Sequence, residues 1–369
     1  MSVILTDDQL EFQSTVRSFL EKRVREPVSR LRDNPDDVDD HLWRALASLE
    51  LLGLGLSEDL HGTGGSWVEL GLVLEEMGAA LTGTPFFATT LAAHALATLA
   101  EPSLTRTWLS TIRDGTCVAT LSLPGNLDRW DEVETPVVAD RRGDRWALSG
   151  VEPRVMFGHE ADVVVSMART LDGFGLFLTE TGQAGLSALA RRTMDPTRPM
   201  ASLTFQDAST TLVAECSGGW HGDARRVLDL AAVALAAEQL GGARRCLQEA
   251  VAYATVRFQH GRAIGSFQAI KHRCADLFIA CEAARSVVYH ALSVASSGVG
   301  DLATAATVAR IAATTAYTNA AETSIQIHGA IGFTQEHPAH LFLKRAKSSE
   351  VLLGGLATQR ERLAQCLEM

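Results

Sequence analysis

The 369-residue chain lacks several features that would assign it to a common class of protein. Its formal net charge is -11 at pH 7, whereas a nucleic-acid surface neutralises phosphates with Lys and Arg. Its six cysteines form no CxxC pair and no zinc spacing, which favours a reduced, cytoplasmic protein without a metal site. Residues 1–12 have no basic segment followed by an apolar core, and no run approaches the roughly 18 apolar residues of a membrane span. We therefore expect no nucleic-acid partner, no signal peptide and no membrane segment.

The overall amino-acid composition is that of a globular protein, and the sequence pattern changes twice along the chain. Hydrophobic residues make up 46% and charged residues 21% of the sequence, which is ordinary for a soluble protein. Residues 1–115 have helical periodicity, residues 116–220 contain short strand-like runs, and residues 221–369 are again helical and rich in Ala. The order predicts an α+β protein with an N-terminal all-α domain, a small middle β domain and a C-terminal helical bundle.

The N-terminal segment contains the start and stop signals of several helices. Thr6 and Gln9 have the spacing of a capping box before an amphipathic helix. A second helix is expected over 41–51, a glycine-rich turn over 53–65, and further helix over 67–99 with a break near Thr84 and Pro85. The acidic cluster at 36–40 is interpreted as a solvated loop and helix start.

Strand-length runs and turn residues alternate in the middle segment. The runs are rich in Val, Leu, Thr and aromatic residues and are separated by turns such as PGN, DRRGD and LDG; they cover 117–123, 145–150, 162–168, 173–179 and 201–208. This pattern predicts a small antiparallel barrel or sandwich. In the C-terminal segment the apolar pattern predicts four long helices, at 224–259, 266–296, 304–327 and 338–367, which would form a four-helix bundle.

The stretch 257–272, which spans the junction of the first two of these helices, has the composition of a ligand-binding arm. Gly261 and Gly265 interrupt the helical pattern and would let backbone approach another group closely. Arg257 offers a rigid fork of donors to a phosphate. Amide and ring contacts to a ligand can come from three more residues, Gln259, Phe267 and Gln268. A helix-loop-helix corner with solvated polar residues is the alternative.

Two long motifs in this segment resemble the signatures of the acyl-CoA dehydrogenase family. The first is RFQHGRAIGSFQAIKHRCAD from Arg257, and the second is IQIHGAIGFTQEHPAHLFLKRAK from Ile325. The resemblance covers nearly the whole chain. It implies FAD as cofactor and an acyl-CoA thioester as substrate. It also implies that the flavin is shared across a subunit boundary, with its adenosine diphosphate half held by the arm of a neighbour.

By this resemblance the FAD-binding residues follow the two motifs. Arg257, Gln259 and His260 would meet the pyrophosphate and ribose, with Gln326, Gly329 and Gly332 beside them. His260 stands where the family usually has Phe. In the middle domain Ser122 keeps the hydroxyl of the family's Thr-Glu-Pro motif. The family's Trp-Ile-Thr, which lies on the flavin face, corresponds to Arg154-Val155-Met156, so the stacking indole and a hydroxyl are absent.

The same resemblance places the catalytic carboxylate at one of two positions, and this chain has neither. A base must remove the α-proton of the thioester while the β-hydride passes to the flavin. The Glu-Gly-Thr position falls at Leu353, followed by Gly354 and Gly355, and the alternative position on the first bundle helix falls at Ala231. Leu and Ala cannot exchange a proton. Glu350, one turn before Leu353, and Glu238, two turns after Ala231, are weaker candidates for a base.

The retained arm and the missing base are reconciled if the chain is one subunit of a hetero-oligomer. It is similar to the base-lacking subunits of bacterial α2β2 acyl-CoA dehydrogenases, several of which act on steroid side-chain CoA thioesters. Three alternatives stay open: a homo-oligomeric dehydrogenase that uses Glu350, a flavin monooxygenase of the same fold, and a binding protein without flavin. His328 and His337 are interpreted as structural or ribose contacts, and His340 with His337 as too few ligands for a metal.

Overall fold

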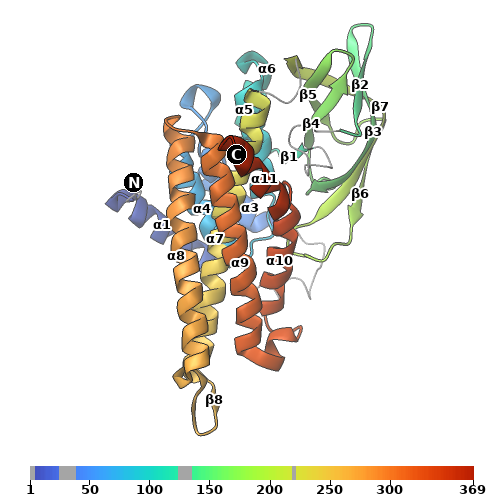
Figure 1. Cartoon of the computed structure of the whole chain (residues 1–369). Coiled ribbons are helices and arrows are strands. Elements are labelled where there is room, and N and C mark those ends of the chain that lie inside the picture. The colour runs from blue at the N-terminus through green and yellow to red at the C-terminus, as the bar shows by residue number, and fades with distance from the viewer. Residues whose placement is uncertain (1–4, 25–38, 124–134, 218–221) are drawn as a thin grey trace.

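The computed structural model describes residues 5–24, 39–123, 135–217 and 222–369. Helices at the N-terminal end and in the C-terminal half pack into one body, and a β-barrel lies against one side of it (Figure 1). The predicted α+β architecture, helical, then β, then helical, is confirmed. The domain boundaries at 115/116 and 220/221 stay predictions.

The N-terminal helices begin and end where local signals place them. Thr6 and Gln9 form the predicted capping box of α1, and Asp39 caps the second helix. The expected break near Pro85 separates two helices, because Leu81 adopts a left-handed conformation at φ 49° and Pro85 precedes the next helix. The helices are α1 (Asp7–Arg23), α3 (Asp40–Ser48), α4 (Trp67–Ala80), α5 (Phe86–Leu99) and α6 (Pro102–Arg113). Residues 36–38 of the acidic cluster lie outside the described residues.

Seven strands of the described chain form one sheet that closes into a barrel. The strands are β1 (Ala119–Ser122), β2 (Val138–Arg142), β3 (Arg145–Met156), β4 (Val163–Thr170), β5 (Gly173–Glu180), β6 (Leu186–Arg191) and β7 (Met200–Ser217). The order β4-β2-β3-β7-β5 is closed by pairing of β5 with β4. The expectation of a wholly antiparallel sheet is wrong, because β1 and β2 pair with β4 in parallel. Strands β2 and β6 were not predicted, since charged and Ala-rich runs give little strand signal.

The C-terminal half contains three long helices and two short ones: α7 (Asp223–Val256), α8 (Gln268–Ser297), α9 (Leu302–His328), α10 (Ala339–Val351) and α11 (Leu356–Cys366). The expected helix over 338–367 is wrong in one respect, because it is interrupted at 352–355. There Leu353 and Gly354 have φ values of 60° and 85°, which end a right-handed helix. The expected helix over 224–259 is three residues too long, because the backbone becomes extended at Arg257.

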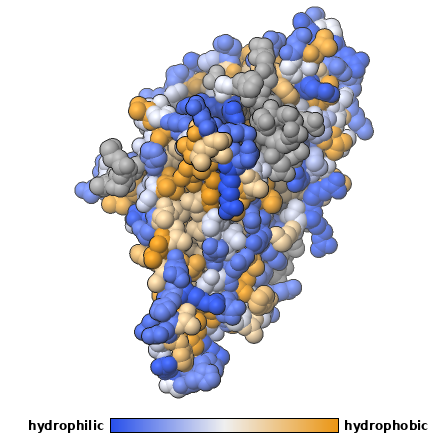
Figure 2. Space-filling view, in the orientation of Figure 1, coloured by the Kyte–Doolittle hydropathy of each residue, from blue (hydrophilic) through white to orange (hydrophobic). Residues whose placement is uncertain are grey.

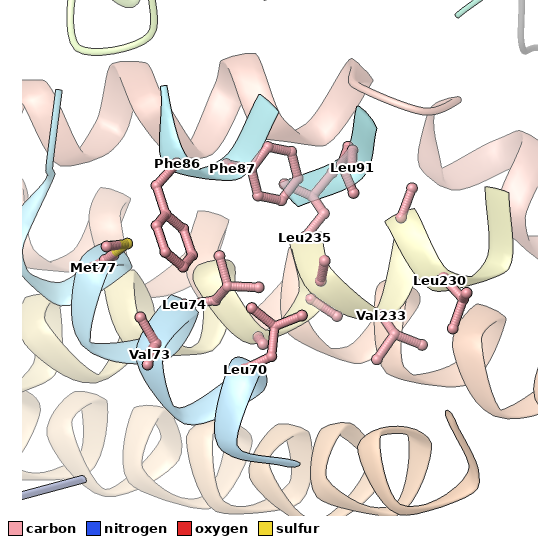
Figure 3. Close-up of a cluster of buried hydrophobic side chains, with 14 of the residues drawn as sticks. Leu70, Val73, Leu74, Met77, Phe86, Phe87, Leu91, Leu230, Val233 and Leu235 are labelled. Carbon is pink, nitrogen blue, oxygen red and sulfur yellow. The ribbon is translucent and has the colours of Figure 1, made fainter. Parts of the chain in front are cut away.

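Helices α4 and α7 pack in direct backbone contact at the centre of the core. Apolar side chains of α4, α5 and α7 meet there (Figure 3). A Cβ atom added at Gly78 would lie 1.9 Å from the carbonyl oxygen of Glu238, and one added at Gly241 would lie 1.7 Å from that of Glu75. The two glycines therefore set the distance between these helices.

A buried polar cluster extends this contact to α1 and α8. Arg244 lies 3.2 Å from Glu75 and 2.7 Å from Glu76. Arg17 of α1 also binds Glu76, at 2.9 Å, and the hydroxyl of Tyr289 in α8 donates to Glu75 at 2.8 Å. Four helices are thus joined through two adjacent carboxylates whose charges are balanced by arginines.

Helix α8 is the one helix of the described residues that is long and apolar enough to cross a membrane. Core helices pass the same test of length and composition, and α8 packs on α7 and α9 in the bundle. The finding is weak evidence for a span.

Replacing Gly241 by Ala is expected to lower the free energy of unfolding by about 3 kcal/mol, because the added methyl group forces α4 and α7 apart. Urea unfolding measures the change. Gly355→Ala is the control, because nothing lies within 4 Å of its Cβ position and its φ of -74° suits Ala. An equal loss in both variants would contradict the close-contact explanation.

Candidate functional site

The predicted arm is a short β-hairpin at the end of the bundle. Strand β8 (Phe258–Gln259) pairs with β9 (Arg262–Ala263), and the hairpin projects beyond α7 and α8 (Figure 1). His260 and Gly261 form the two-residue turn with φ values of 52° and 77°. Positive φ at both central positions is typical of a type I′ turn, which matches the twist of a hairpin.

The two glycines of the arm have different structural roles. Gly261 supplies the turn conformation and has open space around its Cβ position. A Cβ on Gly265, in contrast, would lie 2.9 Å from the carbonyl oxygen of Ala254. Gly265 therefore lets the residues after the hairpin pack against α7, and it is not a point of ligand approach within this chain.

Polar side chains of the arm are exposed. Arg257, Gln259 and Gln268 make no side-chain hydrogen bond or ion pair within the described part of the chain, so their donors are available. Phe267 is different. The guanidinium carbon of Arg262 lies 4.0 Å from its ring centroid, and the ring of His260 meets it edge-on at 6.3 Å. One face of the Phe267 ring is therefore covered, which limits its predicted stacking role.

The second motif lies at the same end of the bundle. Ile327 packs in a small cluster with Ala250 and Ala254 of α7. The ring of His328 lies 4.5 Å from that of Tyr253 and 4.4 Å from that of His337. The Nδ1 of His328 lies 2.7 Å from the carbonyl oxygen of Ser324. These contacts favour the structural interpretation of both histidines.

Three residues of this motif are expected to contact FAD, and two of them are accessible to a ligand. Gln326 is exposed, and the backbone turns at Gly329 with φ 66° and space around its Cβ position. Gly332 is buried, and its Cβ position would lie 3.2 Å from the Cβ of His328, so it serves packing. The structure therefore brings Gln326 and Gly329 to the end of the bundle that carries the hairpin.

Both predicted base positions are buried in apolar surroundings. Ala231 is fully buried in α7, and Leu353 is 4% exposed in the turn between α10 and α11; both belong to the main hydrophobic core. Glu350 lies 3.4 Å from Lys347, which also binds Glu322 at 3.0 Å. The Glu350 carboxylate is thus part of a half-exposed ion cluster.

A buried ion network, which the motifs did not indicate, lies between the barrel and the bundle. Glu238 of α7 binds the guanidinium groups of Arg198 and Arg345, the latter at 2.5 Å. Arg345 of α10 also binds Asp195 at 2.7 Å, and Thr197 accepts three hydrogen bonds from it. Burial alone would raise the pKa of Asp195, but the charges of Arg345 and Arg198 bring it below its usual value. Glu238 is thereby engaged as a structural ion-pair partner.

Directly beside this network, little space remains between α4, α5 and α7. A cavity of about 20 Å³ remains, lined by residues of α4 and α5, by Phe157, and by the network residues Arg198, Glu238 and Arg345. Phe86 and Phe87 of α5 line this cavity, and the Phe86 ring lies toward Met77 and Leu74 in Figure 3. That volume is close to one water molecule, so this cavity has no room for an acyl chain.

On the barrel, the residues that replace the family's flavin-contacting motifs are largely buried. Ser122 is 3% exposed in β1, and Met156 is 5% exposed at the end of β3. The hydroxyl of Thr120 donates to the carbonyl oxygen of Met156 at 2.6 Å. Arg154 is exposed. The barrel therefore presents a cation at the position that the resemblance assigns to an aromatic ring.

Glu152 is a buried carboxyl group that the sequence did not reveal. It is 1% exposed in β3, and its Oε1 has no hydrogen-bond partner within the described residues. Burial raises the pKa of Glu152 to about 8, although the charge of Arg154 opposes the shift. It therefore holds its proton at neutral pH. For metals, the described residues contain no group of three or more His, Cys, Asp or Glu that could bind an ion.

Comparison with known proteins decides the family. The model of the acyl-CoA dehydrogenase N-terminal domain matches residues 6–116, and that of the C-terminal domain matches residues 217–367. The chain belongs to the acyl-CoA dehydrogenase family. It is 34% identical over 363 residues to the acyl-CoA dehydrogenase IpdE2 of Mycolicibacterium smegmatis, covering 97% of this chain and 98% of the relative. Such enzymes are flavoprotein oxidoreductases that act on CH–CH groups, and their cofactor is FAD.

Solved structures with the same fold include two that are named for a pair of proteins. A steroid ACAD, Tcur3481-Tcur3483, matches with a TM-score of 0.87 and 30% identity over 98% of each chain. The ChsE4-ChsE5 complex from Mycobacterium tuberculosis matches with a TM-score of 0.89 and 27% identity over 100% of this chain and 99% of that one. Butyryl-CoA dehydrogenase from Megasphaera elsdenii matches with a TM-score of 0.90 and 25% identity over the full length of both.

Replacing Glu152 by Gln is expected to stabilise this acyl-CoA dehydrogenase chain increasingly as the pH rises. The folded pKa is raised, so the unfolded chain releases the proton above about pH 4.3 while the folded chain keeps it to about pH 8. The free energy of unfolding of the native chain therefore falls as the pH rises across this window. At pH 7.5 the free energy of unfolding of the variant should exceed that of the native chain by about 2 kcal/mol or more. Urea unfolding at pH 5 and pH 7.5 measures it.

The control for this experiment is Glu215→Gln on the exposed face of β7. It should change stability by the same small amount at both pH values. A Glu152→Gln gain that does not grow between pH 5 and pH 7.5 would refute the assignment of a protonated carboxyl group.

Proposed function

We propose that the chain is a subunit of a heteromeric, FAD-dependent acyl-CoA dehydrogenase of the cytoplasm. It supplies the arm that completes the FAD site of a related subunit, and it lacks the catalytic base. The observation that carries this proposal is the burial of hydrocarbon side chains at both base positions, Leu353 and Ala231. Neither side chain can accept an α-proton.

The reaction explains why this deficiency matters. α,β-Dehydrogenation removes a proton from the α-carbon and a hydride from the β-carbon of the thioester. FAD supplies the hydride acceptor when bound. A carboxylate must take the proton from within hydrogen-bond reach, and in our proposal that carboxylate belongs to the related subunit. The small volume of the cavity beside Glu238 and Arg345 agrees with a chain that binds no acyl group of its own.

The arm has the chemistry that the adenosine diphosphate half of FAD requires. Arg257 would bind the pyrophosphate through charge-assisted hydrogen bonds, which are stronger than neutral ones. Gln259 and Gln326 offer amide donors and acceptors to the phosphates and ribose, and Gly329 allows backbone to approach. His260, Phe267, Gln268, Gly332 and Ser122 complete the predicted set, with Gly332 and Ser122 buried.

The similar proteins support both the partner and the substrate in this proposal. Two of the solved structures are named as pairs of chains, and one of these is named a steroid ACAD. We infer an α2β2 assembly with a related subunit and a steroid side-chain CoA thioester as the substrate. The homo-oligomeric alternative gains no support from Glu350, because its carboxylate lies beside Lys347.

The first test compares the chain alone with the chain co-expressed beside related acyl-CoA dehydrogenases that carry Glu at either base position. Alone, it should purify without bound flavin and without activity. With its partner it should give a yellow, active complex. A yellow, active homotetramer of this chain alone would refute the proposal.

Within that complex, Arg257→Gln is expected to weaken FAD binding about tenfold or more, because one charge-assisted pair is lost. The assembly should remain intact by size-exclusion chromatography. Fluorescence titration of the apo-complex with FAD measures the affinity. Arg106→Gln on α6, also an exposed arginine, is the control and should retain native affinity. Equal FAD affinity in the Arg257 variant would exclude the arm as the phosphate-binding element.

A second test locates the base. Glu350→Gln in this chain should leave kcat unchanged, whereas replacing the Glu in the partner's base position by Gln should reduce kcat by at least about 100-fold. Steady-state dehydrogenation with an artificial electron acceptor measures both. Loss of turnover in Glu350→Gln with an intact, flavin-loaded complex would transfer the catalytic role to this chain.

A further inference from the structure

A basic pocket lies away from the arm, where the barrel meets α10. The end of β6, the loop that leads into β7, the turn after β3 and the middle of α10 enclose about 290 Å³. In Figure 1, the lower end of β6 and helix α10 adjoin at this place. Its lining includes Arg191, Arg192, Lys344 and His159. This gathering of cations is notable in a chain with a net charge of -11.

The three permanent cations of this pocket are not neutralised within the described chain. Arg191, Arg192 and Lys344 make no side-chain hydrogen bond or ion pair there. The one carboxylate in the lining, Asp195, is already bound to Arg345 at 2.7 Å and accepts hydrogen bonds from Thr197. Its charge is therefore balanced behind the pocket wall, and the pocket keeps an excess of positive charge.

His159 adds an unsatisfied polar atom to the same lining. Its Nδ1 is buried and has no hydrogen-bond partner within the described residues. Its Nε2 lies 3.4 Å from the carboxylate of Glu160, which does not line the pocket. A buried ring nitrogen without a partner costs free energy that a bound ligand would recover.

We propose that this pocket binds the phosphate group of a small phosphate-bearing molecule. Two arginine forks and a lysine are the donors that phosphate recognition uses. A volume near 290 Å³ is at the low end for ligand pockets, so it accommodates a phosphate or diphosphate and part of the group attached to it. Met194, Pro196 and Met200 supply an apolar wall for that group.

The site is separate from the FAD-binding arm and does not depend on the proposed function. It shares no residue with the hairpin, Lys344 is its one residue from the second motif, and it lies on the barrel side of α10. Two sources can provide the phosphate chemistry: the nucleotide end of a CoA ester, or a free nucleotide or inorganic phosphate. The test separates them.

The experiment is calorimetric titration of the full chain with inorganic pyrophosphate at low, fixed ionic strength. It uses the Arg257→Gln background, so that the arm cannot contribute a diphosphate site. We expect saturable binding to one site per chain. Adding Arg191→Gln and Arg192→Gln together should weaken it at least about tenfold, because two charge-assisted contacts are lost. Arg141→Gln with Arg142→Gln, a matched pair of exposed arginines in β2, should leave it unchanged.

Competition then identifies the source. Displacement of pyrophosphate by CoA but not by ADP or phosphate supports a CoA nucleotide, and displacement by ADP or phosphate alone supports the free ligands. The proposal is overturned if no saturable binding occurs, if sulfate binds equally well, or if the control pair weakens binding as much as the pocket pair. Circular dichroism and thermal unfolding of every variant confirm that each is folded, and a Lys344→Gln variant that also weakens binding supplies a second check.

Discussion

The buried ion network around Arg345 and Glu238 is the interaction on which the relation between barrel and bundle depends. Arg345 comes from α10, Glu238 from α7, and Asp195 and Arg198 from the loop before β7. Removing one partner of such a network leaves an uncompensated buried charge. The free-energy cost of that charge is far larger than the net stabilisation that the intact pair provides. The three segments must therefore be placed together, and this fixes how the barrel sits on the helices.

The two ends of the bundle consequently differ in character. Toward the N-terminal helices, glycines bring α4 and α7 into backbone contact, and aromatic, hydrocarbon and paired ionic side chains fill the interior. At the opposite end, Arg257 and Gln259 of the hairpin are exposed and have no side-chain partner among the described residues, and Phe258 and Phe333 are 64% and 72% exposed. Apolar residues are also visible along the face of the bundle in Figure 2. Exposed aromatic side chains of this kind are typical of a surface that contacts another molecule.

Much of this organisation could be predicted from the sequence. The capping box at Thr6, the break at Pro85 and the long Ala-rich helices follow from local rules. The two motifs led to the family, and the hairpin of the first lies at the same end of the bundle as the start of the second. What could not be predicted depends on distant contacts. The network joins residues up to 150 positions apart, the break at Leu353 requires left-handed backbone that an apolar residue does not signal, and the roles of Gly265 and Gly332 depend on which neighbour they meet.

The two-residue turn at His260 and Gly261 also fixes the length of the arm. Side chains alternate between the two faces of a hairpin, so an insertion of one residue in either strand would exchange the faces of all residues beyond it. Gln259 and Arg262 are directly paired across the hairpin, and their common orientation exists only at the present length. Substitutions at exposed arm positions can therefore accumulate without altering the backbone geometry of the hairpin, whereas a single-residue insertion or deletion would alter it at once. The arm is constrained in length more strictly than in composition.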